Sequence, residues 1–125
     1  MGRKTLAQSE LVQVRIARAE GEVRAAEAFM HAAIDEAWAE AEQGELGLPS
    51  RANLRLAATH AATAAAKAAD AAYELGGGGS IYASSPLQRC FRDVHTMIQH
   101  IMVAEATLKP VGRVLLGQHV GTSQL

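Results

Sequence analysis

The sequence predicts an all-α, up-and-down helical bundle of three long helices and a short C-terminal helix, in a single domain over residues 1–125. Apolar residues recur at alternating steps of three and four, which is the spacing of one helix face. The composition includes 26 alanines, and aromatic residues make up only 4%. Because large side chains are scarce, small residues are expected to fill much of the core and to let helices approach closely.

The first long helix is expected from Leu6 to Gln43. Its apolar seam repeats every seven residues, with larger side chains at one position and mostly alanine at the other. The seam residues are Val12, Ile16, Ala19, Val23, Ala26, Met30, Ala33 and Ala37. The following segment, Glu42 to Pro49, contains two glycines and a proline and predicts a short turn between antiparallel helices.

The second helix is expected from Arg51 to Leu75, with Ser50 as its N-cap. Its predicted apolar stripe comprises Leu54, Ala58, Ala61, Ala65, Ala68 and Ala72. His60 lies beside the polar face, and we interpret it as a solvated histidine.

Glycines at 76–79 and Ser80 follow the second helix. This run has the sequence of a flexible linker, which is one interpretation. The other is that glycines end the helix and then let the backbone approach a ligand or a second chain without Cβ atoms.

The third helix is expected to start near Pro86, because Ser85 suits the N-cap and Gln88 stands at the capping-box position. Its core stripe is Leu87, Phe91, Val94, Ile98 and Ile101. Two polar stripes lie beside it: Arg89, Asp93, Thr96 and His100 form one, and Arg92, His95 and Gln99 form the other. Pro110 is expected to interrupt or restart the helix, and Val111 to Leu116 to form a short apolar turn.

Composition argues against several classes of partner. The net charge of −1 and the pI near 6.5 provide no basic field for nucleic acid or anionic lipid. The most apolar segment, Leu54 to Leu75, contains charged residues and is not expected to span a membrane. Cys90 is the only cysteine, which excludes an internal disulfide. We therefore expect a soluble, cytoplasmic protein with no nucleic-acid or membrane partner.

The spacing of polar residues predicts no metal site, because His95 and His100 are five residues apart and lie on different helix faces. The start of the third helix, with Arg89 and Arg92, could accept an anion. On spacing alone, Arg89 and Asp93 are more simply explained as a surface ion pair.

Three motifs carry a resemblance to a known family: Ser84 to Thr96, Gln99-His100, and Val111 to Gly117. They resemble the C-terminal helical domain of the acyl-CoA dehydrogenase superfamily. The most similar branch is the two-component flavin-dependent monooxygenases, which include the 4-hydroxyphenylacetate hydroxylase oxygenase and the dibenzothiophene monooxygenases. The resemblance covers nearly the whole chain, and the Arg92-Asp93 helix is its most specific part. The family has a glycine loop where residues 76–80 stand, which favours the second interpretation of that run.

The resemblance implies roles for particular residues. Ile101 stands where the dehydrogenases have the catalytic glutamate of a Glu-Gly-Thr motif, so acyl-CoA dehydrogenation is disfavoured. His100 matches a histidine that faces the flavin in the monooxygenases, where it takes a proton from the substrate or donates a hydrogen bond. The resemblance also implies flavin contacts, to FAD or FMN, or interface contacts. The residues concerned are Ser84, Ser85, Arg89, Arg92 and Asp93, and Asp93 is expected to orient the two arginines.

The family's enzymes are about three times as long and hold flavin between this domain and two preceding domains. Either the chain is a fragment, or a second polypeptide supplies the remaining flavin-binding domains, alongside a flavin reductase. The expected partner is also a further copy of the chain, in a dimer or tetramer, and the chain alone is expected to bind little or no flavin. The alternative function is a non-catalytic helical association module, or a truncated fragment of an acyl-CoA dehydrogenase-like protein.

Overall fold

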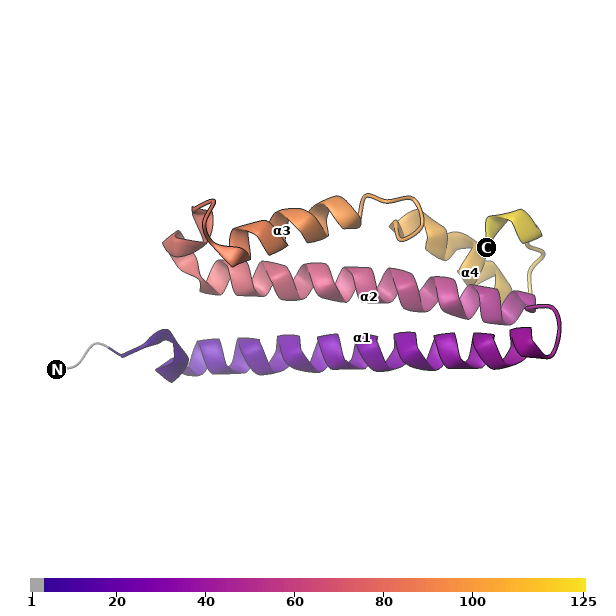
Figure 1. Ribbon diagram of the computed structural model, residues 1–125, viewed down its shortest axis with the longest axis horizontal. Coiled ribbons are helices and arrows are strands. Elements are labelled where there is room, and N and C mark those ends of the chain that lie inside the picture. The colour runs from indigo at the N-terminus through magenta and orange to yellow at the C-terminus, as the bar shows by residue number, and fades with distance from the viewer. Residues whose placement is uncertain (1–3) are drawn as a thin grey trace.

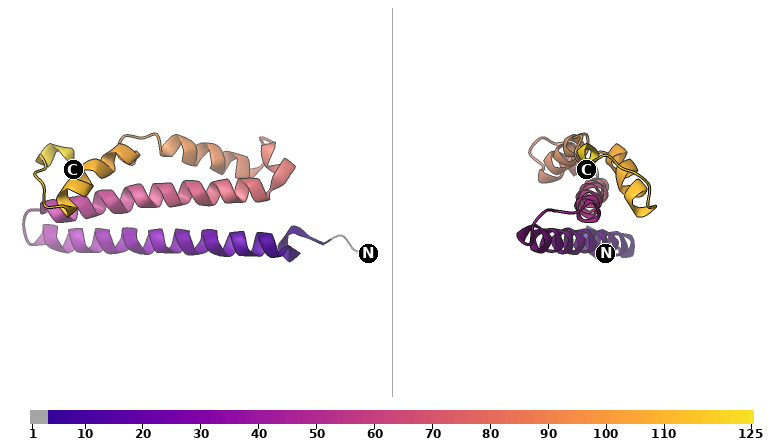
Figure 2. Two further views of the ribbon diagram at one scale, coloured as in Figure 1. Left: turned by 180° about the vertical axis from the view of Figure 1, so that it is seen from behind. Right: turned by 90° about the vertical axis from the view of Figure 1, so that its right-hand side faces the viewer.

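The computed structural model describes residues 4–125, and that part of the chain is entirely helical with connecting turns. The helices are α1 (Glu10–Glu42), α2 (Leu48–Leu75), α3 (Pro86–Met97) and α4 (Leu108–Leu115). Helices α1 and α2 run antiparallel along the length of the molecule, and α3 and α4 follow one another along the other side of α2 (Figure 1). The end-on view in Figure 2 shows α2 in the middle of this arrangement. The all-α class is confirmed, although the third helix has 12 residues and is not long.

The contact between α1 and α2 is made chiefly of alanines. Ala26, Ala33 and Ala37 of α1 are buried, as the seven-residue seam predicted. The larger seam residues lie at its edge, since Ile16 is 49% exposed and Val23 is 37% exposed. No side chain larger than serine is fully buried among the described residues, so the core is thin.

The buried face of α2 differs from the predicted stripe. The residues of α2 with the least exposure are Ala52, Ala57, Thr59, Ala62, Ala64 and Ala66. A single stripe was expected, but α2 contacts α1 on one side and α3 and α4 on the other. Packing on both sides buries positions around more of the helix, including the polar residue Thr59. Its hydroxyl lies 3.0 Å from that of Thr107.

The start of α2 is closed by a carboxylate from α1. The N-cap residue is Gly47, three residues before the predicted Ser50, and Pro49 lies in the first turn. Glu40 Oε1 accepts a hydrogen bond of 3.0 Å from the Gly47 backbone N–H, and Ser50 Oγ donates to Glu40 Oε2. These two hydrogen bonds to the ionised form, first that from Ser50 and then that from Gly47, lower the pKa of Glu40.

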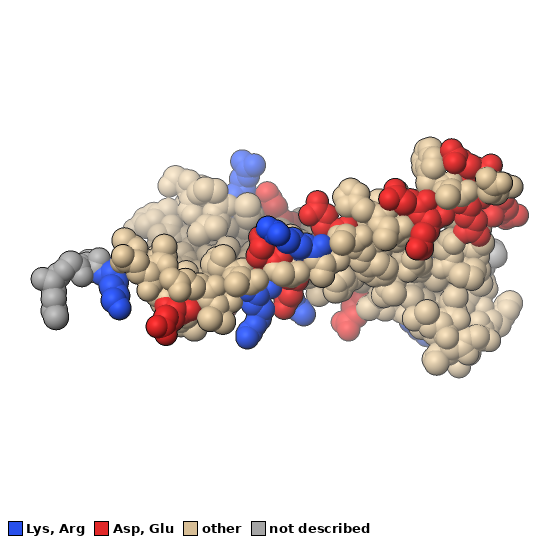
Figure 3. Space-filling model, turned by 90° about the horizontal axis from the view of Figure 1, so that it is seen from below, with Lys and Arg blue, Asp and Glu red and all other residues tan. Residues whose placement is uncertain are grey.

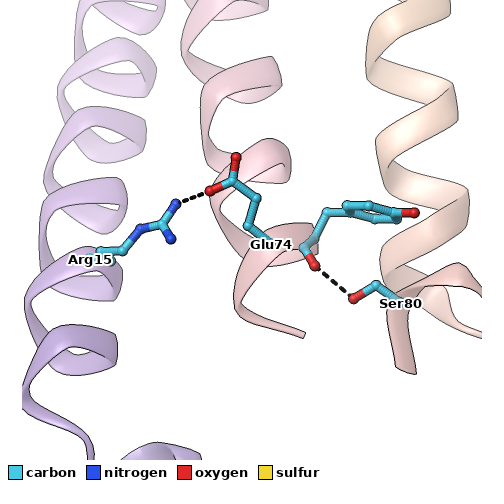
Figure 4. A network of polar contacts seen from close by, with 4 residues as sticks. Arg15, Glu74 and Ser80 are labelled. Atoms are coloured by element: carbon cyan, nitrogen blue, oxygen red, sulfur yellow. Dashed lines mark hydrogen bonds and ion pairs between the residues drawn. The ribbon is translucent and has the colours of Figure 1, made fainter. Parts of the chain in front are cut away.

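The glycine segment between α2 and α3 is folded and packed. Residues Gly77–Ile81 form a 3₁₀ turn, and Ser80 is 1% exposed with its hydroxyl donating to the Tyr73 carbonyl at 2.8 Å (Figure 4). A Cβ at Gly76 would lie 2.1 Å from Ser80 Oγ and 2.7 Å from Leu87 Cδ1, so any larger residue would force these side chains to shift. Nearby, Arg15 of α1 forms an ion pair of 2.5 Å with Glu74 (Figure 4). Residues 76–80 are thus an ordered corner rather than a free linker.

After α3 the chain makes turns before α4 begins. Gln99 N–H donates to the Thr96 carbonyl, and His100 N–H donates to the Met97 carbonyl. Each of these hydrogen bonds joins residues three positions apart, whereas an α-helix joins residues four apart. Arg55 of α2 donates to the Met102 carbonyl at 3.0 Å and holds this segment. Pro110 lies in the first turn of α4, where a missing N–H costs no helical hydrogen bond. Within residues 4–125, no helix combines the length and the apolar character that a bilayer crossing requires.

Candidate functional site

The N-terminus of α3 is built largely as predicted. Ser85 is the N-cap residue, with extended backbone angles, and Pro86 is the first helical residue. The predicted capping box is wrong, because the Ser85 side chain makes no capping hydrogen bond. Gln88 Oε1 is instead buried with no hydrogen-bond partner in the described part of the chain. The first backbone N–H groups of α3 therefore have no side-chain cap, while Ser84 beside them is exposed.

The charged residues of α3 lie on its surface. Arg89 Nε is 3.8 Å from Asp93 Oδ2, and the two side chains are 77% and 68% exposed. This is the surface pair that the four-residue spacing predicts, and such a pair contributes only a few tenths of a kcal/mol, about 0.3–0.5. Arg92 is also exposed and makes no ion pair with residues 4–125. Asp93 thus lies near Arg89 and does not orient Arg92.

His100 is placed differently from the prediction. The expected polar stripe assumed that the helix continues to His100, but α3 ends at Met97 and His100 lies in the following turn. The side chain is exposed, and its Nδ1 accepts a hydrogen bond of 3.2 Å from the Met102 backbone N–H. Because Nδ1 accepts, a neutral His100 ring carries its proton on Nε2 and presents an N–H donor to its surroundings.

A second histidine, His95, is held much more firmly than His100. His95 Nε2 lies 2.6 Å from Asp70 Oδ1 of α2, and the side chains are 38% and 41% exposed. The ring of His95 also packs on Phe91, with centroids 4.5 Å apart, and Phe91 packs on Tyr73 at the same distance. The pairing joins residues 25 positions apart, and no local spacing could have indicated it.

Asp70 and His95 line a hollow of about 650 Å³ between α2, α3 and the segment that leads to α4. Polar groups from α2 and the turns share the lining with aliphatic side chains. The full lining is Thr59, Thr63, Ala66, Lys67, Asp70, His95, Ile98, Gln99, Val103, Ala104, Glu105 and Leu108. His100, Arg89 and Arg92 are not part of it.

The family model for the acyl-CoA dehydrogenase C-terminal domain matches residues 1–105 of the chain. The chain belongs to this family. The domain is similar to indole-3-acetate monooxygenase of Pseudomonas putida, with 37% identity over 118 residues. It is also similar to indole-3-acetate monooxygenase of Acinetobacter baumannii, with 32% identity over 117 residues. These alignments cover 94% and 93% of the chain, and the chain spans 30% of the length of each relative.

One end of this acyl-CoA dehydrogenase C-terminal domain offers groups that suit an anionic ligand. Gly77, Gly78 and Gly79 are exposed, and a Cβ on any of them would meet no atom within 4 Å. Open space above a glycine backbone lets a ligand approach the peptide groups closely. The uncapped N–H groups of α3 and the guanidinium of Arg89 lie at the same corner of the fold, where α2 passes into α3.

The other end of the domain is acidic. Figure 3 shows carboxylate side chains gathered over the end where α1 turns into α2. Residues 27–45 contain six acidic residues and no lysine or arginine. This end would repel an anionic group such as a phosphate, whereas the glycine corner at residues 76–80 contains no acidic residue.

Proposed function

We propose that this chain is the flavin-facing and oligomer-forming C-terminal domain of a reduced-flavin-dependent monooxygenase. The observation that carries the proposal is the 37% identity to an indole-3-acetate monooxygenase over 94% of the chain. Indole-3-acetate, or a related aromatic acid, is the substrate class that this similarity supports. The complete enzyme requires further flavin-binding domains, either in the same polypeptide or in a separate one, together with a flavin reductase.

The glycine corner and the start of α3 would hold the flavin, as FAD or FMN. Exposed peptide groups at Gly77 to Gly79 and the N–H groups of α3 would face its phosphate. Arg89 and Arg92 would add positive charge, Ser84 and Ser85 would contribute hydroxyls, and Asp93 would orient Arg89. Reduced flavin, when bound, supplies the electrons for activating dioxygen.

His100 would be the catalytic residue. Its Nδ1 already accepts from Met102 N–H, so the neutral ring directs an Nε2–H donor outwards. This geometry favours donating a hydrogen bond to a reacting oxygen. To take a substrate proton at Nε2, the neutral ring would first have to carry its own proton on Nδ1. It would then lose the hydrogen bond from Met102 N–H.

Association of copies would use the side of α1 that α2 leaves open. Ile16, Val23, Ile34 and Trp38 are between 37% and 69% exposed. At 3.6 residues per turn they fall within about 60° of one another, which forms an apolar stripe along α1. A shallow hollow of about 230 Å³ between α1 and α2 adjoins it at Val23 and Met30. Two copies would pair antiparallel, because a parallel pair would bring two acidic 27–45 segments together.

The second candidate function is a helical association module without catalysis, and the exposure of His100 favours it. Such a module would keep the α1 stripe and need no flavin.

The deciding experiment measures product formation from indole-3-acetate by the complete assembly with supplied reduced flavin. His100→Ala should lower the rate by about 10²- to 10⁴-fold, and His100→Gln, which keeps a donor, should lose less. His119→Ala, at another exposed histidine, is the matched control and should keep full activity. Full activity of His100→Ala would remove His100 from catalysis. No product from the unmodified assembly would leave the association module as the remaining function.

The chain alone should retain neither FMN nor FAD through gel filtration, because one corner supplies only part of the contacts that a flavin needs. A yellow protein with stoichiometric flavin would show that the corner is a complete site.

A further inference from the structure

The hollow beside Asp70 and His95 has features of a ligand site separate from the glycine corner. It measures about 650 Å³, which lies within the range of about 300–1,000 Å³ that small-molecule sites occupy. Its lining combines aliphatic side chains, among them Ile98, Val103 and Leu108, with seven polar or charged residues. In small-molecule sites, apolar walls bury the body of the ligand and polar groups fix its orientation.

The Asp70 carboxylate sets the chemistry of the His95 ring. An ionised carboxylate can only accept hydrogen bonds, so the contact of 2.6 Å places the ring proton of His95 on Nε2. In the neutral ring, Nδ1 is then an acceptor with a free lone pair. No residue among 4–125 donates to this nitrogen.

The position of this acceptor is fixed by packing. The His95 ring lies against Phe91, whose own ring lies against Tyr73 of α2. Together with the Asp70 contact, this stacking restrains the imidazole from two directions. A restrained acceptor loses little entropy when a ligand donates to it.

The charges around the hollow select against anions. Asp70 and Glu105 contribute two carboxylates, and Lys67 contributes one ammonium group. An anionic ligand would therefore meet a net negative wall, whereas an uncharged ligand would meet no net penalty.

We propose that this hollow binds a small uncharged organic molecule with an apolar body and one O–H or N–H group, which donates to His95 Nδ1. The apolar body lies against Ile98, Val103 and Leu108, and Asp70 holds the acceptor tautomer. The site requires neither flavin nor His100, so it stands independently of the function proposed above.

Three probes of equal ring size test the proposal on the 125-residue chain at pH 8. Benzyl alcohol has the donor, benzyl methyl ether lacks it, and benzoate carries a negative charge. Binding is followed through the ¹⁵N and ¹H shifts of the His95 ring. Benzyl alcohol should shift these signals saturably. The ether and benzoate should each bind about tenfold more weakly or worse, because the ether cannot donate to His95 Nδ1 and benzoate carries an unfavourable charge.

Two variants separate the site from general surface binding. Val103→Trp should fill the hollow and abolish the shifts while leaving the Asp70 contact in place. Asp70→Asn should weaken benzyl alcohol binding, because an amide no longer fixes the tautomer. His119→Ala, outside the hollow, should bind as the unmodified chain does.

Three outcomes would overturn the proposal. They are equal affinity for the alcohol and its ether, shifts that persist in Val103→Trp, and no saturable shift up to the solubility limit of benzyl alcohol.

Discussion

Glu40 of α1 caps the N-terminus of the neighbouring helix, α2. Its carboxylate accepts hydrogen bonds from Gly47 N–H and Ser50 Oγ at the start of α2, where the helix dipole favours negative charge. The pKa of the folded carboxyl is lowered from its ordinary value of 4.5. As the pH falls, the unfolded chain therefore binds the proton first. The stability that Glu40 contributes is present above pH 4.5 and is lost as the pH falls through the lowered pKa of the folded state.

From this we predict that Glu40→Gln lowers the melting temperature at pH 7. The difference from the unmodified chain should shrink as the pH falls from 4.5 through the lowered pKa of Glu40, below which both side chains are uncharged. Glu45→Gln is the control, with the same charge change at a side chain that is 92% exposed and 4.0 Å from Arg51. A difference between Glu40→Gln and the unmodified chain that does not change from pH 7 to pH 3 would contradict the assigned cause.

Truncation of His95 should cost more stability than truncation of His100. His95→Ala removes the Asp70 hydrogen bond and the contact with Phe91, and should cost about 1–3 kcal/mol of unfolding free energy in urea denaturation. His100→Ala removes an exposed side chain and should change stability by less than about 0.5 kcal/mol. A larger loss for His100→Ala than for His95→Ala would mean that the loop packs differently.

The corner between α2 and α3 depends on one glycine more than on the others. A Cβ at Gly76 would lie 2.1 Å from Ser80 Oγ and 2.7 Å from Leu87 Cδ1. Gly76→Ala should therefore destabilise the chain by about 1–3 kcal/mol, as overpacking does. Gly78→Ala meets no atom within 4 Å and should leave stability within about 0.5 kcal/mol. Equal stabilities of the two variants in urea would show that α3 is free to move away from α2.

The end of α3 illustrates how neighbouring elements shape a helix. The apolar steps to Ile98 and Ile101 predict a longer helix, but Ile101 is 77% exposed in the turns that follow. Arg55 binds the Met102 carbonyl, and Thr59 meets Thr107, so contacts with α2 replace further helical turns. The stripe Arg89, Asp93, Thr96 and His100 is therefore not one continuous surface.

For the molecule as a whole, the thin alanine core predicts association. Burial of little apolar area per residue, at about 25 cal/mol per Å², leaves a lone chain marginally stable. We predict a dimer or tetramer in sedimentation equilibrium, and the double change Val23→Glu and Ile34→Glu should reduce it to monomers. Val14→Glu is the control, since Val14 is 55% exposed but lies on another side of α1. A well-folded monomer at micromolar concentration would refute the prediction.

The sequence by itself determined the helical class, the two long antiparallel helices and the start of α3. Each depends on neighbours along the chain: the seam of Ala26, Ala33 and Ala37, the glycines of the first turn, and Ser85 before Pro86. Such signals are local, because helix periodicity and capping involve residues within a few positions of one another. The family resemblance was also legible in the Arg92-Asp93 helix and is confirmed by the family match.

Only the tertiary structure decided which polar residues meet. Glu40 reaches Gly47 and Ser50, and Asp70 reaches His95, because antiparallel packing brings separate helices into register. The rotation of each helix about its axis selects these partners, and on an alanine-rich surface a local pattern leaves that rotation poorly specified. The periodicity of the sequence predicted that His100 lies on a face of α3. Contacts from α2 to Met102 and Thr107 instead place His100 in a turn after the helix.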